Sequence, residues 1–174
     1  MEYTIEHGIE ILERTPFILQ SFLKNLSDTW TMCNEGENTW SAYDIVGHLV
    51  HGEKTDWTQR LEIILSDDTN KTFTPFDRFA QFESSKGKSL NVLLEEFKVL
   101  RKKNLEILKS LDIQETQFEL EAIHPSLGKV TLKELLAAWV AHDLGHIAQI
   151  SRVMAKQYKH EVGPWQEYLT ILHR

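Results

Sequence analysis

Residues 131–157 read TLKELLAAWVAHDLGHIAQISRVMAKQ, the longest helical pattern in the chain. Apolar residues recur in it at intervals of three and four, which is the spacing of one face of an α-helix. Thr131 and Glu134 form a capping box, in which each side chain accepts a hydrogen bond from the other residue's backbone amide. The pattern predicts one helix from Thr131 to about Gln157, whose apolar face must be buried against other helices.

Three segments on the N-terminal side of this helix carry the same periodicity. Leucines at helical spacing predict a helix over residues 89–111, and a second capping box opens a predicted helix over residues 41–65. Residues 3–26 predict one kinked helix or two consecutive helices, because Pro16 lacks the backbone N–H that a helix interior uses. Together with the first helix, these segments predict a four-helix bundle.

The connections between these helices read as loops and turns. Residues 27–40 are polar, and residues 66–88 lack helical periodicity but contain four phenylalanines. A loop this long and aromatic covers either one end of the core or the mouth of a site. A short last helix follows the Gly163-Pro164 pair, and no alternating run typical of a strand occurs. We therefore expect one all-α domain over residues 1–174, a four-helix bundle with short extra helices at the termini.

Composition and charge exclude several classes of protein. The net charge is −7, and the basic residues are scattered rather than clustered, which argues against a nucleic-acid partner. No apolar stretch approaches the roughly 20 residues needed to cross a membrane, and the N-terminus lacks the features of a signal peptide. Cys33 is the only cysteine, so no intrachain disulfide is possible. A reducing compartment is the simplest interpretation, and we expect a cytoplasmic protein.

Histidines at two places suggest metal chemistry. His142 and His146 are four residues apart, so a helix places both side chains on one face, where they continue the apolar stripe. Buried imidazoles need hydrogen bonds or a metal, because an unpaired buried polar group costs about 1–3 kcal/mol. A third ligand from the 41–65 helix would complete a site. Periodicity alone does not choose between His48 and His51 for that position.

Several stretches carry a resemblance to a known family. They are ERTPFILQSFL (13–23), WSAYDIVGHLVHGEKTDWTQRL (40–61), HPSLGKVTLKELLAAWVAHDLGHIAQISRVMAKQY (124–158) and VGPWQEYL (162–169). With them the chain resembles the DinB-like superfamily of four-helix bundles, which includes the YfiT-type metal-dependent hydrolases and thiol S-transferases. The resemblance implies that one histidine of the second helix and two of the H-x-x-x-H helix bind a divalent cation. Carried over by position, these are His48, His142 and His146.

The resemblance implies a function as well as a site. Three imidazoles suit zinc or nickel and leave coordination positions open for water or substrate. The implied reactions on a small-molecule substrate are hydrolysis and transfer of a low-molecular-weight thiol cosubstrate. Two alternatives stay open: a non-catalytic metal- or ligand-binding or stress-related bundle protein, and a purely structural bundle with hydrogen-bonded core histidines. A homodimer is also consistent with the family.

The candidates for acid–base or orienting roles are Glu53, Asp56 and Gln149, with Asp143 next to a predicted ligand. For each of them, a solvated or capping role is an alternative. The H-x-x-x-H pair lacks the glutamate of the HExxH motif, which argues against a thermolysin-like peptidase. The tryptophans are expected to pack in the core and at its ends; they are Trp40, Trp57, Trp139 and Trp165. Alternatively, Trp57 and the phenylalanines of residues 73–82 wall a pocket above the metal.

Overall fold

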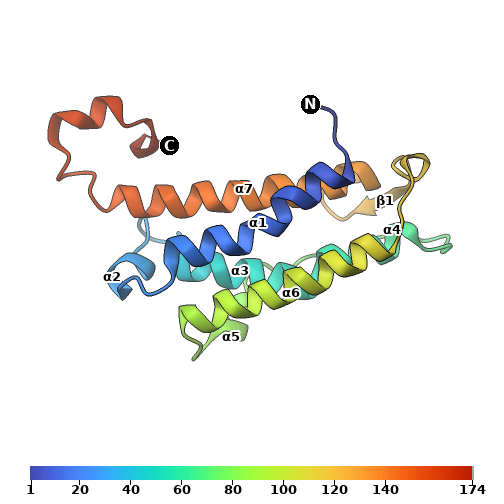
Figure 1. Cartoon of the computed structure of the whole chain (residues 1–174), viewed down its shortest axis with the longest axis horizontal. Coiled ribbons are helices and arrows are strands. Elements are labelled where there is room, and N and C mark those ends of the chain that lie inside the picture. Colours follow the sequence, from blue (N-terminus) through green and yellow to red (C-terminus); the bar gives the residue numbers. More distant parts are fainter. Residues whose placement is uncertain (174) are drawn as a thin grey trace.

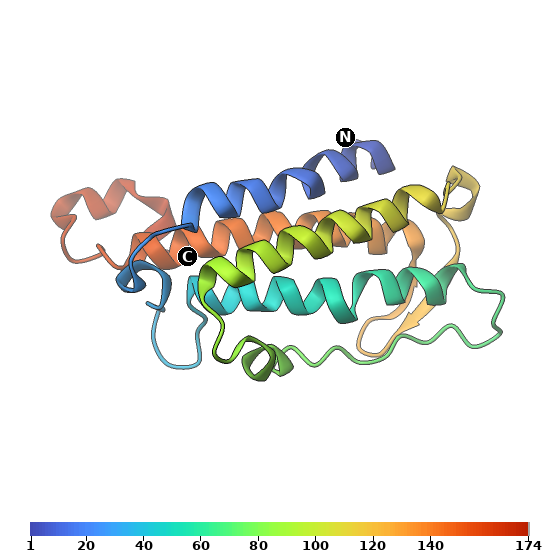
Figure 2. The ribbon, with the colours of Figure 1, turned by 60° about the horizontal axis from the view of Figure 1, so that its bottom comes forward.

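The computed structural model describes residues 1–173, and four long helical segments form its main body (Figure 1). They are α1 (Ile5–Leu23), α3 with α4 (Ala42–Thr55 and Trp57–Leu65), α6 (Leu90–Ser110) and α7 (Leu132–Lys156). Both α1 and α3 pack against α6 and against α7, so the chain crosses the bundle diagonally from α1 to α3 and again from α6 to α7 (Figure 2). The predicted four-helix bundle is confirmed.

Both predicted capping boxes are present at the helices that carry the histidines. At the start of α3, Asp44 Oδ2 accepts from the Ser41 amide at 2.9 Å, and Ser41 Oγ accepts from the Asp44 amide at 3.2 Å. At the start of α7, Thr131 and Glu134 make the same reciprocal pair. These local contacts satisfy amides that the first helical turn leaves unpaired, so they fix where each helix begins.

The N-terminal segment forms a single helix in spite of its internal proline. Pro16 lies inside α1 and has no N–H to donate to the Leu12 carbonyl, four residues earlier. The guanidinium of Arg101 on α6 takes that role, because Arg101 Nη1 donates to Leu12 O at 3.0 Å. The tertiary hydrogen bond therefore compensates for the one that proline removes.

The predicted helix over residues 41–65 is divided in two. Asp56, with φ −124° and ψ −74°, lies outside the helical region and separates α3 from α4. The Asp56 carboxylate then turns along α4, where its Oδ1 lies 2.6 Å from Arg60 Nε. The helical period continues through the break, which is why the sequence pattern gave no sign of it.

The expectation that the chain has no strands is wrong. Strand β1 (Glu121–His124) pairs antiparallel with β2 (Gly128–Thr131), and β2 leads directly into α7. The loop after α4 joins this hairpin: the Phe73 amide donates to Ile123 O at 2.9 Å, and the Ile123 amide donates to Lys71 O at 2.7 Å. Strands of four residues are too short to show an alternating pattern.

Short helices interrupt both predicted loops. One is α2 (Asp28–Thr31), and the other is α5 (Ala80–Ser85), which packs on α3. The contact with α3 is close at Gly47, the residue before His48. A Cβ built there would lie 2.6 Å from Ser85 Oγ, so only glycine lets α5 approach this far.

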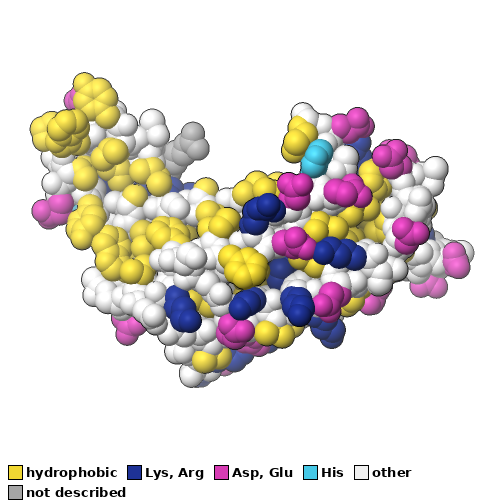
Figure 3. All heavy atoms as spheres, viewed as in Figure 1, with side chains coloured by type: hydrophobic (Ala, Val, Ile, Leu, Met, Phe, Trp, Pro, Cys, Tyr) yellow, Lys and Arg dark blue, Asp and Glu magenta, His cyan; other side chains and the backbone are white. Residues whose placement is uncertain are grey.

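The C-terminal segment extends beyond one end of the bundle (Figure 1). It consists of two 3₁₀ helices, η2 (Gly163–Tyr168) and η3 (Thr170–Leu172); a third, η1 (Glu115–Gln117), precedes the hairpin. Trp165 is 72% exposed, so the expectation that it packs in the core is wrong. Hydrophobic side chains gather on this extension in Figure 3. Among the described residues, no helix is long and apolar enough to cross a membrane.

The buried core has a polar middle. One apolar cluster includes Val46 and Phe97, and the other includes Leu61 and Leu105. Buried charged residues come between the two clusters along α3, α6 and α7; they are Glu53, Arg101 and Asp143. The histidines predicted as metal ligands belong to the same part of the bundle.

Candidate metal centre

Three histidines from two helices meet in the middle of the bundle. His142 and His146 are one turn apart on α7, and His48 comes from α3. The Nε2 atom of His142 lies 3.1 Å from Nε2 of His48 and 3.1 Å from Nε2 of His146. One potential ligand atom from each side chain lies within 4.8 Å of the others. His51, the alternative third ligand, points elsewhere and its Nε2 contacts Asp77 O at 3.1 Å.

The three rings cannot satisfy one another by hydrogen bonding alone. A neutral imidazole has one N–H and one lone pair, so His142 Nε2 offers either a single proton or a single lone pair to two neighbours. At least one of its two 3.1 Å contacts is therefore unmatched. A cation that accepts all three Nε2 lone pairs removes the mismatch, and the donor set thus fits a divalent metal.

Two neighbours prepare the rings to offer Nε2. Gln149 Oε1 lies 2.8 Å from His146 Nδ1, so the ring proton stays on Nδ1 and the lone pair on Nε2. The Asp143 carboxylate lies 3.9 Å from His142 Nδ1, too far for a hydrogen bond but close enough to favour a proton there. Within the described chain, Nδ1 of His48 has no hydrogen-bond partner.

Burial keeps the imidazoles of His48 and His146 neutral. Loss of solvent lowers the pKa of His48 to about 3, with further lowering by the charges of His146 and His142. The pKa of His146 falls to about 4, first because of burial and then because of the charge of His142. Both rings are thus unprotonated near pH 7, which is the form that binds a metal.

A buried ionic cluster, here called the Arg101 cluster, adjoins the histidines. Its members are Glu53, Arg101, Asn104, Trp139 and Asp143. Asp143 receives two hydrogen bonds from Arg101, of 2.6 and 3.0 Å, and Glu53 receives one of 2.8 Å. Burial is the largest single influence and raises the pKa of Asp143, but the charge of Arg101 and the hydrogen bonds to the carboxylate together outweigh it and lower the pKa overall.

No expectation from the sequence included this cluster. A signal was nonetheless present. Arg101 lies four residues after Phe97 and four before Leu105, so it falls on the apolar face of α6. An arginine on such a face predicts buried carboxylate partners.

The carboxylate candidates have different surroundings. Both oxygens of Glu53 are occupied, one by Arg101 and Trp139 and the other by Asn104, so this side chain is held within the cluster. Asp56 is 9% exposed and pairs with Arg60. Burial raises the pKa of Asp56, and the charges of Arg60 and His142 offset part of that rise.

Aromatic rings surround the histidines. The Trp40 ring lies 4.9 Å from that of His48, and the Phe76 ring lies 5.6 Å from it. On the other side, the Trp57 ring lies 5.2 Å from that of His142 and stacks on Trp139 at 5.5 Å. Of the rings in the alternative interpretation, Trp57 and Phe76 contact the histidines. Phe73 is instead buried in the core, to which Trp57 also belongs, and Phe79 and Phe82 are exposed.

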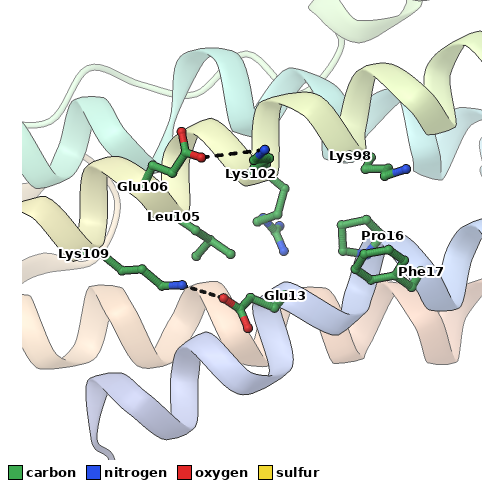
Figure 4. Close-up of a pocket in the computed structure, with 9 residues that line it drawn as sticks. Glu13, Pro16, Phe17, Lys98, Lys102, Leu105, Glu106 and Lys109 are labelled. Atoms are coloured by element: carbon green, nitrogen blue, oxygen red, sulfur yellow. Dashed lines mark hydrogen bonds and ion pairs between the residues drawn. The ribbon is translucent and has the colours of Figure 1, made fainter.

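The cavity between α1 and α6 is separate from this centre (Figure 4). Its volume is about 330 Å³, and none of the three histidines lines it. Two ion pairs lie along it, Lys109 with Glu13 at 2.6 Å and Lys102 with Glu106 at 4.0 Å. It reaches the polar middle of the bundle only at Arg101, whose guanidinium is already bonded to Asp143 and Glu53.

Comparison with known proteins agrees with the arrangement of the helices. A family model described as the DinB superfamily matches residues 11–150. The chain belongs to the DinB superfamily. Its structure is similar to that of YfiT from Bacillus subtilis, described as a probable metal-dependent hydrolase with an unusual four-helix bundle topology. The TM-score is 0.74 at 21% identity, over 88% of this chain and 87% of YfiT, and this likeness shows a shared fold. No curated protein sequence matches the chain.

Proposed function

We propose that this DinB-superfamily protein is a metal-dependent hydrolase of a small molecule, with His48, His142 and His146 as the metal ligands. The observation that carries the proposal is the convergence of three Nε2 atoms, with 3.1 Å contacts that hydrogen bonds cannot all satisfy. Zinc and nickel are the metals that three neutral imidazoles favour. The description of YfiT as a probable metal-dependent hydrolase supports the same assignment.

The charge of the surroundings favours a cation at this position. The Arg101 cluster contains two carboxylates and one guanidinium, a net charge of −1 in the buried middle of the bundle. Asp143 lies directly beside the proposed ligand His142. A divalent cation bound by three neutral histidines would therefore be partly balanced without a carboxylate ligand.

The chain's own residues have definite tasks in such a reaction. A bound divalent cation would lower the pKa of a coordinated water and polarise a carbonyl group. Gln149 holds the Nδ1 proton of His146, and the rings of Trp40, Trp57 and Phe76 limit the access of bulk water. Asp56, whose burial raises its pKa, is the carboxylate we assign as proton acceptor.

The first test is the metal content of protein purified without an affinity tag or chelator. We expect about one zinc or nickel per chain in the wild type, and none in His48→Ala or His142→Ala. His51→Ala is the matched control, since His51 lies on the same helix but contacts the loop, so it should retain the metal. A wild type that takes up no metal on reconstitution, or a His142→Ala variant that binds it fully, would overturn the proposal.

The second test is turnover of a panel of small esters and amides by the metal-loaded protein. Asp56→Asn should keep the metal and lose about 10²–10⁴-fold in rate, the usual contribution of a positioned base. Asp44→Asn, in the capping box of the same helix, is the control for a lost carboxylate away from the centre. Equal rates for Asp56→Asn and the wild type would remove Asp56 from the mechanism.

A further inference from the structure

A polar pocket of about 270 Å³ adjoins two of the three histidines, His48 and His146. The residues that line it are Glu35, Asn38, Thr39, Trp40, Arg78, Gln149 and Arg152. Two of its walls contact proposed metal ligands: the Trp40 ring lies 4.9 Å from that of His48, and Gln149 Oε1 lies 2.8 Å from His146 Nδ1. A small molecule in this pocket would lie against the residues that hold the metal.

The pocket carries an excess of positive charge. Glu35 is the only carboxylate among the lining residues, and it is already paired. Arg152 donates to both of its oxygens, at 2.9 and 2.8 Å, and Lys156 lies 2.9 Å away. The hydrogen bond from Arg152 is the main reason that the pKa of Glu35 falls to about 2. Two cations thus share one anion, and Arg78 adds a third positive charge.

Arg78 is available to a ligand. Among the described residues its guanidinium has no ion-pair partner and packs over the Phe79 ring at 4.9 Å. Stacking on a ring face leaves the N–H groups at the edge of the guanidinium free to donate. Its charge also contributes, after burial and the other histidines, to the lowered pKa of His48. Among the described residues, Arg78 is therefore a cation without an ion-pair partner that lines the pocket.

The backbone around Arg78 is tied to that centre. Phe76 packs its ring against the rings of His48 and His51, at 5.6 and 5.0 Å. The Asp77 carbonyl contacts His51 Nε2 at 3.1 Å, and Asp77 Oδ1 accepts from the Phe79 amide at 2.9 Å. These contacts hold the residues on both sides of Arg78 and so limit where its side chain can reach.

We propose that this pocket binds a carboxylate or phosphate group of the substrate and that Arg78 recognises it. An arginine fork donates two parallel hydrogen bonds to such a group, which gives orientation as well as affinity. The rest of the substrate would extend past Trp40 and Gln149 to the histidines. The inference rests on the proposed metal site and adds a substrate class to it: small molecules with an anionic group.

The test uses cobalt(II)-loaded protein and two small thiols as probes. Binding of a thiol to the metal gives a sulfur-to-cobalt charge-transfer absorption, which reports affinity without turnover. The probe 3-mercaptopropionate carries a carboxylate, whereas 2-mercaptoethanol is similar in size and neutral. We expect the wild type to bind 3-mercaptopropionate at least about tenfold more tightly, as hydrogen bonds to a charged group imply.

Variants of Arg78 test whether this residue causes the preference for 3-mercaptopropionate. Arg78→Gln should reduce it to within about twofold, and Arg78→Lys should retain part of it, because the charge stays but the fork is lost. Arg14→Gln is the matched control: it removes the same charge from an exposed position on α1 and should leave the preference intact. A preference that persists in Arg78→Gln, or is absent from the wild type, overturns the inference.

Cobalt content, measured first in every variant, separates the two proposals. Full cobalt occupancy with no Arg78-dependent preference refutes the anion pocket alone. A wild type that binds no cobalt refutes the metal site and the inference with it. Arg78 is exposed, so its substitution should leave folding unchanged, which a matching circular dichroism melting curve would verify.

Discussion

Two residues that are neighbours on α7, His142 and Asp143, belong to two polar regions that differ in whether their hydrogen bonds are satisfied. Asp143, in the Arg101 cluster, accepts two hydrogen bonds from Arg101, and Leu12 and Glu53 occupy the other Nη donors of the same guanidinium. His142, one residue earlier, has an Nε2 whose neighbours are two other Nε2 atoms. We call the first region complete because its two carboxylates and all the Nη donors of Arg101 are paired within the chain, although Arg101 Nε has no partner among the residues that the structure describes. The second region is incomplete, because its Nε2 atoms are all matched only with an added cation. Ring nitrogens that converge on one another without matching donors thus mark the proposed binding site, whereas paired opposite charges mark the structural cluster.

The largest effect should come from breaking the complete region. Arg101→Met leaves the Glu53 and Asp143 carboxylates buried without their partner and removes the hydrogen bond to Leu12. We expect a loss of about 3–5 kcal/mol in the free energy of unfolding, measured by urea denaturation. Lys102→Met is the control, since Lys102 is 80% exposed, and should change stability by less than about 0.5 kcal/mol. Equal stabilities would show that the cluster does not hold the bundle together.

An intermediate effect should follow from a change at the edge of the incomplete region. Gln149→Leu removes the acceptor that keeps the His146 proton on Nδ1. Metal affinity should fall by about 10–100-fold, or about 1.4–2.7 kcal/mol, in a competition titration against a chelator. Gln149→Glu keeps an acceptor at the same position and should retain or increase the affinity. If Gln149→Leu bound metal as tightly as the wild type, Gln149 would have no part in orienting the ligand.

The smallest effect, taken per pH unit, is that of acidity on stability, and it tests whether the incomplete region is neutral. Burial lowers the folded-state pKa of His48 to about 3, whereas the unfolded value is near 6.5. Between these values the unfolded chain binds more protons, so acidification favours unfolding. Metal-free protein should therefore lose stability as the pH falls from about 6.5 towards 4, by at most about 1.4 kcal/mol per pH unit for each such histidine.

His48→Gln provides the comparison for that measurement. Urea unfolding of both metal-free proteins at pH 7, 6 and 5 gives the free energy of unfolding as a function of pH. The slope of this dependence should be shallower for the variant, because it lacks the His48 imidazole, whose pKa is lowered in the folded state. The other titrating groups contribute equally to both curves. Identical slopes would mean that His48 titrates normally in the folded protein.

Within single helices, sequence was a reliable guide. Capping boxes at Ser41 and Thr131 correctly marked the starts of α3 and α7, because a cap depends on residues only three positions apart. The i, i+4 spacing of His142 and His146 likewise places both on one face. The hairpin before α7 escaped detection because its strands are four residues long and pair mainly through backbone atoms.

At the site too, spacing along the chain predicts only part of the arrangement, and helix packing decides the rest. Helical periodicity did not distinguish His48 from His51 as the third metal ligand, since the two lie about 60° apart around their helix. The packing angle of α3 against α7 decides between them, bringing His48 to 3.1 Å from His142 and directing His51 to the loop. Arg78 had no sequence signal, because its position depends on how that loop is anchored by Phe76 and Asp77.

By itself, the sequence determined the long helices, two of their caps and a histidine pair on one helical face, all consequences of spacing along the chain. Tertiary structure alone decided which third histidine joins that pair and which carboxylates Arg101 neutralises. It also decided that Arg78 lines the same pocket as Trp40 and Gln149, which contact two of the histidines. The physical reason is that these contacts join residues 42 to 94 positions apart, and their geometry depends on the relative rotation and register of packed helices.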